Sequence, residues 1–288
     1  MKTATTSEAA ESEALEAIAE RLCATTEPGA RDVARRLFAN GASTELIDVV
    51  LDLLQEEDAR GAFAIDAAAK VLGRSVRLMP PPRRTLATAA MFAFVGPAGV
   101  GKTTVLRKLA HGMIEKDRRP LCLSIDPRAA DEPDPVALIR IEDAENLRQV
   151  LRRHGPTDAV LVDTPGLSPR RGRDLAGLGE ELRALSPGGR ASLLLVLPST
   201  DARTELRKNF QRFAPLKPDG VVLTHLDRCS VPATAVEEVA RARLPLAFLA
   251  AGEGPGEGLW RPTPDRVADL FLRGHIAGNR ASSSRNRN

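Results

Sequence analysis

The stretch that decides the fold of this chain reads GPAGVGKTT and comprises Gly96, Pro97, Ala98, Gly99, Val100, Gly101, Lys102, Thr103 and Thr104. It matches the pattern G-x-x-x-x-G-K-[ST] of a phosphate-binding loop. The apolar run at residues 90–95 predicts a buried strand before it, and apolar positions at helical spacing over 105–113 predict a helix after it. A chance glycine-rich turn is the alternative, but it does not account for strand, pattern and helix occurring together.

The residue types in this loop predict a nucleoside triphosphate as the ligand. Glycines let backbone N–H groups turn toward phosphate oxygens, and the helix that follows points its positive end at them. Lys102 is expected to reach the β- and γ-phosphates, and the hydroxyl of Thr103 is expected to bind Mg²⁺.

Composition narrows the class of protein. The chain has 288 residues, 43% of them hydrophobic, which suits one large or two modest domains. A net charge of +3 is mild, so we expect neither DNA nor RNA as a partner. Three widely spaced cysteines and a polar start without an apolar core predict a cytoplasmic protein without a signal peptide.

The first part of the chain predicts a small helical bundle. Apolar residues recur at helical spacing in four segments, at about 15–22, 33–38, 46–54 and 65–72, and Ser43 is expected to cap the third helix. The pair Pro28-Gly29 is expected to break the first helix, and the proline-rich run at 80–84 is expected to be a linker. We therefore expect a bundle domain at 1–84, a nucleotide-binding domain at 85–278 and a disordered tail at 279–288.

From about residue 88 the pattern alternates between strands and helices. Apolar runs predict strands at 121–125, 136–141, 159–162, 192–197, 220–223 and 245–249, with helices at 143–153, at 264–272 and after a cap at Thr200-Asp201. This alternation predicts an α/β domain of the P-loop NTPase type with a mostly parallel sheet, whose ligand lies at the carboxyl ends of the strands.

A second motif, Asp163-Thr164-Pro165-Gly166, follows an apolar strand. An aspartate at this point holds Mg²⁺, commonly through water, and Gly166 leaves its N–H free to approach a γ-phosphate. Asp-x-x-Gly alone is a weak signal, because both residue types are common in loops. Its place after a strand, downstream of the phosphate loop, makes the interpretation stronger.

A third motif, Thr224-His225-Leu226-Asp227, predicts guanine as the base. The carboxylate of Asp227 can accept hydrogen bonds from the N1–H and the 2-amino group of guanine, whereas adenine offers a mismatched edge. The usual form [NT]-K-x-D has lysine where His225 stands, and the histidine ring either stacks on the base or plays no part. An ordinary surface loop is the alternative. Gly252 and Glu253, after the strand at 245–249, are expected to approach the base.

The order of these motifs resembles the NG module of the signal-recognition-particle GTPase family, and most of all its flagellar branch, FlhF. The most specific similarity is the block from residue 213 to 227, with FAPLKPDGVVLTHLD, preceded by LVLPST at 195–200. Ser168-Pro169-Arg170, after the second motif, also resembles that branch. The resemblance covers roughly residues 10–273.

The resemblance implies a GTPase that uses Mg²⁺ and acts in flagellar biogenesis. It implies that Asp126 positions the attacking water, so Asp126, Lys102 and Gly166 are the expected catalytic residues. It further implies GTP-dependent homodimerisation, a flagellar basal-body or MinD-like regulatory partner, and peripheral contact with the inner face of the membrane. The stretch 126–135 is shorter and richer in proline than the family's insertion, and Leu167 replaces the family's arginine.

These departures leave other readings open. One is a catalytically weak nucleotide-binding scaffold that recruits flagellar or membrane-targeted proteins, because the phosphate loop is intact while the insertion is trimmed. Another is a protein-targeting GTPase like the signal-recognition-particle receptor. A third, an ATPase of the MinD or ParA type, is disfavoured because those proteins carry a second lysine early in the phosphate loop, where this chain has Pro97 and Ala98.

Overall fold

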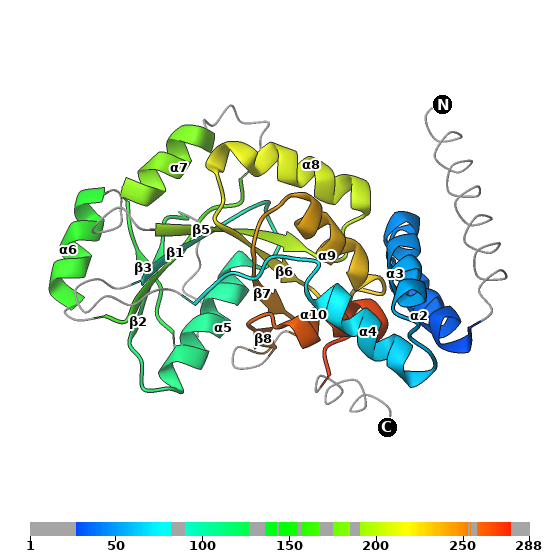
Figure 1. Cartoon of the computed structure of the whole chain (residues 1–288). Coiled ribbons are helices and arrows are strands. Elements are labelled where there is room, and N and C mark those ends of the chain that lie inside the picture. Colours follow the sequence, from blue (N-terminus) through cyan, green and yellow to red (C-terminus); the bar gives the residue numbers. More distant parts are fainter. Residues whose placement is uncertain are drawn as a thin grey trace, which may run out of the picture. The chain divides into compact units, whose positions relative to one another are not determined.

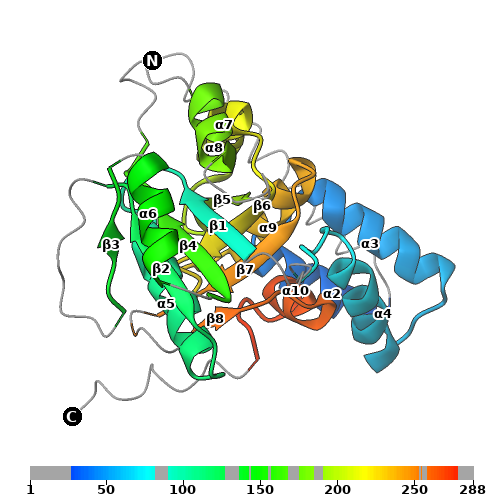
Figure 2. The same cartoon turned by 90° about the vertical axis from the view of Figure 1, so that its left-hand side faces the viewer.

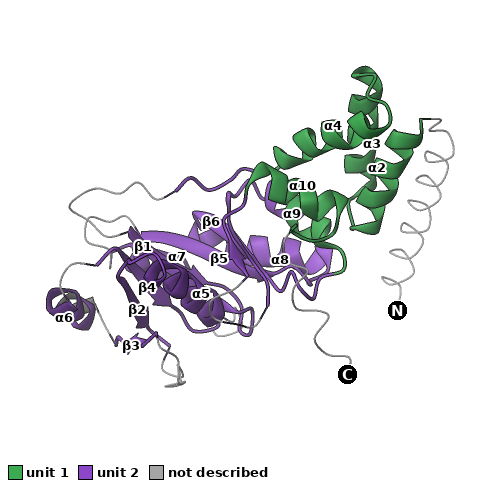
Figure 3. Cartoon of the chain, turned by 90° about the horizontal axis from the view of Figure 1, so that it is seen from below, with its two compact units in different colours: residues 1–76, 230–237, 263–288 green, residues 77–229, 238–262 purple. Residues whose placement is uncertain are grey.

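A computed structural model of the chain describes residues 27–81, 90–126, 136–142, 144–154, 157–167, 175–184, 191–252, 254 and 258–277. Several predictions fall outside these residues: the helix at 15–22, the trimmed stretch after Asp126, the Ser168-Pro169-Arg170 resemblance, Glu253 and the tail at 279–288. The chain divides into two units, which Figure 3 colours separately.

The larger unit comprises residues 77–229 and 238–262 and contains, among the described residues, an eight-stranded sheet (Figure 1). Its strand order is β3-β2-β4-β1-β5-β6-β7-β8, and every neighbouring pair is parallel except β7 and β8. The strands are β1 Ala90–Val95, β2 Pro120–Ser124, β3 Ile139–Arg140, β4 Ala159–Asp163, β5 Ala191–Pro198, β6 Gly220–Thr224, β7 Leu246–Ala250 and β8 Leu259–Trp260.

The sequence explains why the central strands lie where they do. β4 and β6 are buried along their whole length, as near-continuous apolar runs in a parallel sheet require. Helix α5 packs against β2 and β4 on one face, as Figure 2 shows. The helices of this unit are α5 Lys102–Ile114, α6 Ala144–His154, α7 Leu175–Ala184, α8 Arg203–Phe213 with the 3₁₀ turn η2 Ala214–Leu216, and the end of α9 Pro232–Arg241.

The sheet brings the sequence motifs to one edge. Strand β1, which leads into the phosphate loop, pairs with β4 so that Phe94 lies opposite Asp163. On the other side, β5 separates β1 from β6, which ends at Thr224, and β7 follows β6. Because parallel strands end at the same edge, the three motifs converge there, at the place where such sheets bind ligands.

The smaller unit comprises residues 1–76, 230–237 and 263–288. Its described helices are α2 Pro28–Ala39, α3 Thr44–Glu56, α4 Ala62–Gly73, α10 Pro264–Leu272 and the first part of α9. Helices α4 and α10 pack closely, because Gly73 has no side chain: a Cβ there would lie 2.6 Å from the carbonyl oxygen of Pro264. Among the described helices, none has the length and apolar character that crossing a membrane requires.

The predicted P-loop fold with a mostly parallel sheet is confirmed, and so is the cap at Ser43, whose hydroxyl accepts a hydrogen bond from the N–H of Leu46. The division of the chain differs from the expected one at 84 and 85. Helix α10, which we expected in the nucleotide-binding domain, packs on α4 and α2 in the smaller unit.

Two local predictions are wrong. The strand expected at 136–141 is reduced to β3, because only Ile139 and Arg140 pair with β2. The expected cap at Thr200-Asp201 does not form: α8 begins at Arg203 without a side-chain cap, and Asp201 instead accepts a hydrogen bond from Asn209. The pair Pro28-Gly29 opens α2, since proline fits the first turn, where its missing N–H is not needed, and the helix that it was expected to end lies outside the described residues.

Candidate nucleotide-binding site

The phosphate loop has the backbone geometry that its glycines permit. Gly96 and Gly101 adopt φ values of 149° and 89°, which side chains rarely allow. A Cβ at Gly96 would lie 2.5 Å from the carbonyl oxygen of Val196, so this glycine also lets the loop cross closely over β5. Gly101 directly precedes α5, whose first-turn N–H groups therefore face the loop.

Lys102 is folded back onto this loop. Its side chain is buried, and its Nζ donates hydrogen bonds to the carbonyl oxygens of Pro97 at 2.7 Å and Gly96 at 3.5 Å. Burial lowers the pKa of Lys102, while the nearby carboxylates of Asp163 and Asp126 act against that shift. The ammonium thus occupies acceptors of the loop itself and is available to exchange them for phosphate oxygens.

Thr103 and Asp163 form a pair that fits Mg²⁺. The hydroxyl of Thr103 donates to Oδ2 of Asp163 at 2.7 Å, and Asp163 is only 2% exposed. The other oxygen, Oδ1, is buried without a hydrogen-bond partner among the described residues. Burial raises the pKa of Asp163, and the Thr103 hydrogen bond and the charge of Lys102 oppose the rise.

This donor set suits magnesium better than a metal held by protein ligands alone. In the described part of the chain, no group of three or more His, Cys, Asp or Glu side chains is placed to hold a metal ion. Mg²⁺ is commonly bound through one or two protein oxygens together with substrate phosphates and water. A hydroxyl and a carboxylate with an orphaned oxygen, next to a phosphate loop, match that pattern.

The loop after β4 packs directly on the phosphate loop. A Cβ at Gly166 would lie 2.6 Å from the Cα and Cβ of Ala98, so only glycine fits there. The N–H of Leu167 donates to the carbonyl oxygen of Gly96 at 3.0 Å, and Leu167 is 5% exposed. We call residues 96–104 and 163–167 together the phosphate end of the site.

Asp126 lies just beyond the end of β2, with its N–H bonded to the hydroxyl of Ser124 at 3.1 Å. Its charge influences both Lys102 and Asp163. The structure therefore brings Asp126 into the electrostatic neighbourhood of the other two expected catalytic or metal-binding groups.

Thr224 connects the third motif to the phosphate loop. It is buried at the end of β6, and its hydroxyl bonds to the carbonyl oxygens of Val100 at 2.8 Å and Leu197 at 3.3 Å. The next residue, His225, has a φ of 58° and turns its ring toward the loop, since a Cβ at Gly101 would lie 3.7 Å from its Nε2.

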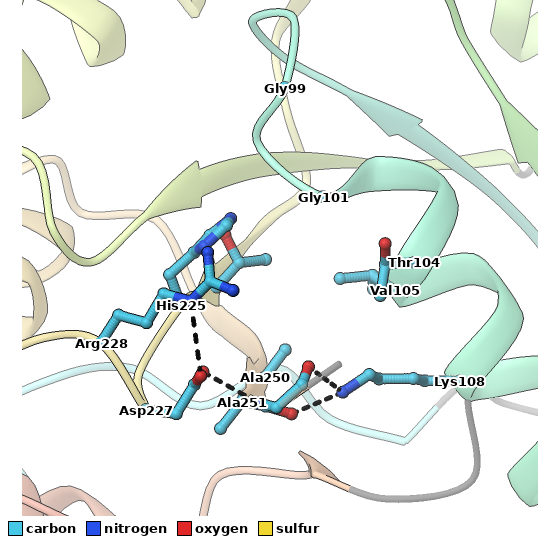
Figure 4. Close-up of a pocket in the computed structure, with 12 residues that line it drawn as sticks. Gly99, Gly101, Thr104, Val105, Lys108, His225, Asp227, Arg228, Ala250 and Ala251 are labelled. Atoms are coloured by element: carbon cyan, nitrogen blue, oxygen red, sulfur yellow. Dashed lines mark hydrogen bonds and ion pairs between the residues drawn. The ribbon is translucent and has the colours of Figure 1, made fainter. Parts of the chain in front are cut away.

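A pocket of about 260 Å³ lies beside this junction, and Figure 4 shows the side chains around it. Asp227 faces it, with Oδ1 accepting a hydrogen bond from the N–H of Gly252 at 2.8 Å and Oδ2 lying 3.8 Å from Nε of Arg228. We call this part of the site the base end. Its lining residues are Gly99, Gly101, Thr104, Val105, Lys108, Thr224, His225, Asp227, Arg228, Ala250, Ala251 and Gly252.

Sequence reasoning missed Lys108 in this pocket. It projects from α5 and donates hydrogen bonds to the carbonyl oxygens of Ala251 at 2.5 Å and Gly252 at 2.7 Å. The sequence offered no signal for it, because its burial, at 4% exposed, follows from the tertiary structure, and a buried lysine needs polar partners. Of the predicted site residues, all but Glu253 lie in the described part of the chain.

No protein-family model matches this chain. Its homologues include FlhF proteins and a signal recognition particle protein. It is 30% identical to the flagellar biosynthesis protein FlhF of Pseudomonas aeruginosa over 233 residues, which cover 76% of this chain and 52% of that protein. It is 28% identical to the signal recognition particle protein of Thermus aquaticus over 256 residues, 84% of this chain and 57% of that protein. The chain spans about half the length of the curated relatives it matches.

Solved structures share the fold. A crystal structure of FlhF complexed with GTP and Mg²⁺ superposes with a TM-score of 0.70 at 19% identity, covering 85% of this chain and 99% of that one. The receptor FtsY of Elizabethkingia anophelis, in complex with GDP, superposes with a TM-score of 0.65 at 18% identity, covering 82% and 83%. The fold is thus that of the signal-recognition-particle GTPases and FlhF.

Proposed function

We propose that this protein binds GTP together with Mg²⁺ and acts as an FlhF-like switch in flagellar biogenesis. The proposal rests on one observation: the phosphate end and the base end lie at the carboxyl ends of strands in the same sheet. The phosphate end supplies a lysine, a hydroxyl and an orphaned carboxylate oxygen, and the base end supplies Asp227 beside a pocket of about 260 Å³. FlhF homology supports the flagellar role.

In this mechanism the chain's own groups exchange partners when GTP enters. Lys102 leaves the carbonyl oxygens of Pro97 and Gly96 and donates to phosphate oxygens, a charge-assisted bond that is stronger than the one it replaces. Asp163 keeps the Thr103 hydroxyl oriented and offers Oδ1 to the metal side. Bound Mg²⁺ supplies charge neutralisation between the phosphates.

The γ-phosphate is the part of GTP that can reach the loop after β4. Gly166 lies against Ala98 of the phosphate loop, so we propose that its backbone N–H meets the γ-phosphate there. Contacts that exist only with a third phosphate order such loops, and hydrolysis releases them. We propose that this difference between GTP and GDP is the signal, read by a second copy of the chain or by a flagellar partner.

Competition between nucleotides tests the base assignment. Calorimetric titration with GTP, GDP and ATP in Mg²⁺ is expected to show GTP binding at least about 10-fold tighter than ATP, because only guanine satisfies Asp227 with two donors. Lys102→Ala should weaken GTP binding by about 100-fold, since hydrogen bonds to charged groups contribute about 1.5–3 kcal/mol each. A preference for ATP would contradict the proposal.

A catalytically weak scaffold is the second candidate, and one observation favours it. Leu167 occupies the place where the family resemblance puts an arginine, and its side chain is buried at 5% exposure. A buried leucine donates nothing to a charged transition state, and loss of a stabilising arginine can cost about 10³-fold or more in rate.

Single-turnover hydrolysis distinguishes the two candidates. Purified protein in excess over GTP is compared with Lys102→Ala, and sedimentation with a non-hydrolysable GTP analogue reports whether two copies pair. Turnover above the Lys102→Ala baseline supports the GTPase. Tight binding at the baseline rate supports the scaffold, and Leu167→Arg is then expected to raise the rate if Asp126 already positions water.

A further inference from the structure

Lys108 is a buried cation that lines the base end of the site, and the proposed function does not explain it. It lies on α5, the helix that begins at the phosphate loop, and its side chain is 4% exposed. Taking an ammonium group out of water is costly unless it is fully engaged by polar partners. A leucine or methionine would fill the same helix position without this desolvation cost, so the presence of a lysine needs an explanation.

Its partners are the backbone of the loop after β7. The Nζ of Lys108 donates to the carbonyl oxygens of Ala251 and Gly252, at 2.5 Å and 2.7 Å. Across the loop, the N–H of Ala251 donates to the carbonyl oxygen of Gly258 at 2.7 Å. A Cβ at Gly258, which has a φ of 74°, would lie 3.4 Å from Nζ, so the loop fits closely around the ammonium.

The same loop sets the carboxylate that reads the base. The N–H of Gly252 donates to Oδ1 of Asp227 at 2.8 Å. Lys108 therefore fixes the carbonyl side of the residue whose amide fixes Asp227. Figure 4 shows this chain of contacts, running from Lys108 on α5 through the loop to Asp227.

We propose that Lys108 is a positioning residue for base recognition, a strut that holds the loop at residues 250–252 so that Asp227 presents its carboxylate to guanine. The proposal rests on the proposed function and adds a specificity device to it. Because α5 also begins at the phosphate loop, the strut sets the spacing between the phosphate end and the base end of one nucleotide.

The strut predicts a loss of discrimination, which a merely structural lysine would not produce. Inosine triphosphate lacks the 2-amino group of GTP, so the ratio of the two affinities measures how well Asp227 is aimed. Without the strut, the carboxylate and the loop sample several arrangements, and the extra donor of guanine gains little. Lys108 lines the pocket at the base end and lies outside the residues of the phosphate end, so phosphate binding is expected to remain.

The experiment measures affinities for GTP, inosine triphosphate and inorganic tripolyphosphate, each with Mg²⁺, in the full chain. In the unmodified protein, GTP is expected to bind about 10-fold tighter than inosine triphosphate, the value of one hydrogen bond to a charged group. In Lys108→Met the ratio should fall to about 2 or less, while tripolyphosphate affinity stays within about 2-fold. Lys108→Arg, which keeps donors, should recover part of the ratio, and Lys116→Met, an exposed lysine beyond the same helix, should leave it unchanged.

The outcomes separate the two proposals. A folded Lys108→Met that keeps the full ratio overturns the strut. If the unmodified protein does not prefer GTP to ATP, the proposed function fails, whatever Lys108 does. Should Lys108→Met not fold, Lys108→Gln takes its place, because its shorter amide cannot reach both carbonyls, and the same ratio decides.

Discussion

The phosphate end and the base end of this site are built in different ways, although both lie at the carboxyl ends of strands in one sheet. At the phosphate end, polar groups pair directly with one another: Lys102 with the carbonyl oxygen of Pro97, and Thr103 with Asp163. At the base end, Asp227 is held by a loop that is itself held from α5 by Lys108.

This difference indicates which part of the nucleotide each end recognises. The phosphate end depends on backbone geometry and on contacts that admit no side chain, such as Gly166 against Ala98. Phosphate binding there should therefore be lost when a single atom is added, but it should not depend on which base the nucleotide carries. The base end depends on one carboxylate and its supports, so changes there should alter which nucleotide binds more than whether phosphate binds.

Asp163→Asn tests the phosphate end most severely. We expect GTP affinity in Mg²⁺ to fall by about 100-fold, because an amide keeps the Thr103 hydrogen bond but removes the charge that holds the cation, and changes at metal supports cost about 10–100-fold. Titration calorimetry with and without EDTA measures it. With EDTA, the variant and the unmodified protein should bind alike, and a normal response of the variant to Mg²⁺ would contradict the metal assignment.

The raised pKa of Asp163 predicts how the effect of Mg²⁺ on GTP affinity depends on pH. A carboxyl that keeps its proton to a higher pH is a poorer cation ligand at low pH, so the Mg²⁺-linked gain in GTP affinity should shrink as pH falls through that raised pKa. Asp163→Asn should show no such pH dependence.

Gly166→Ala tests the contact between the two loops of the phosphate end. The new Cβ would lie 2.6 Å from Ala98, so the loop must move and the bond from Leu167 to Gly96 is expected to be lost, at a cost of about 1–3 kcal/mol. Urea unfolding with and without GTP measures the change.

Gly112→Ala is the matched control for that substitution. Gly112 lies inside α5, and a Cβ there would have nothing within 4 Å, so alanine should stabilise the protein by about 0.5–1 kcal/mol. A Gly166→Ala protein that is as stable as Gly112→Ala would show that the loops do not pack as described.

His225→Lys tests the base end. A lysine stem is expected to lie along the base plane and place its ammonium near the phosphate loop, where the His225 ring now lies beside Gly101. GTP and GDP should both bind about 3-fold tighter, since both carry the same base and a cation–π or packing contact contributes about 0.5–1 kcal/mol. His154→Lys on α6 controls for added charge, and a gain for GTP alone would place His225 at the phosphates instead.

The sequence predicted the phosphate end well because its chemistry is local. A fixed spacing links Gly96, Lys102 and Thr103, and a strand followed by Asp-x-x-Gly places Asp163 beside them in a parallel sheet. Alternating apolar runs likewise predicted the sheet and the helix at 264–272. Helices α7 and α9 and strand β8 were not predicted, although α9 carries the buried apolar residues Val236 and Val239 at helical spacing; β8 is only two residues long.

The base end could be predicted only in part. Asp227 followed from its motif, but the loop that holds it through Gly252 is itself held by Lys108, which lies 143 positions from its partner Ala251. No spacing rule reports such a pair, because loop geometry after β7 decides which carbonyls face α5. Whether a lysine is buried depends on tertiary packing, and the same pattern of residues along the helix is compatible with an exposed lysine.

Asp201→Asn is the test with the smallest expected effect. Asp201 is linked to the base end only through its electrostatic interaction with His225. Burial and then Glu205 raise the pKa of Asp201, while His225 and the Asn209 hydrogen bond lower it. A carboxyl whose folded-state pKa is raised stabilises the fold below its unfolded pKa and loses that contribution as pH rises through the folded pKa. The variant should therefore match the unmodified protein at low pH and exceed its unfolding free energy at neutral pH by about 0.5 kcal/mol or less, because solvent screens this partly exposed group. Urea unfolding across pH checks this. Glu205→Gln in the same protein should reduce the difference, and a variant less stable than the parent at neutral pH would contradict a net penalty for the buried Asp201 charge.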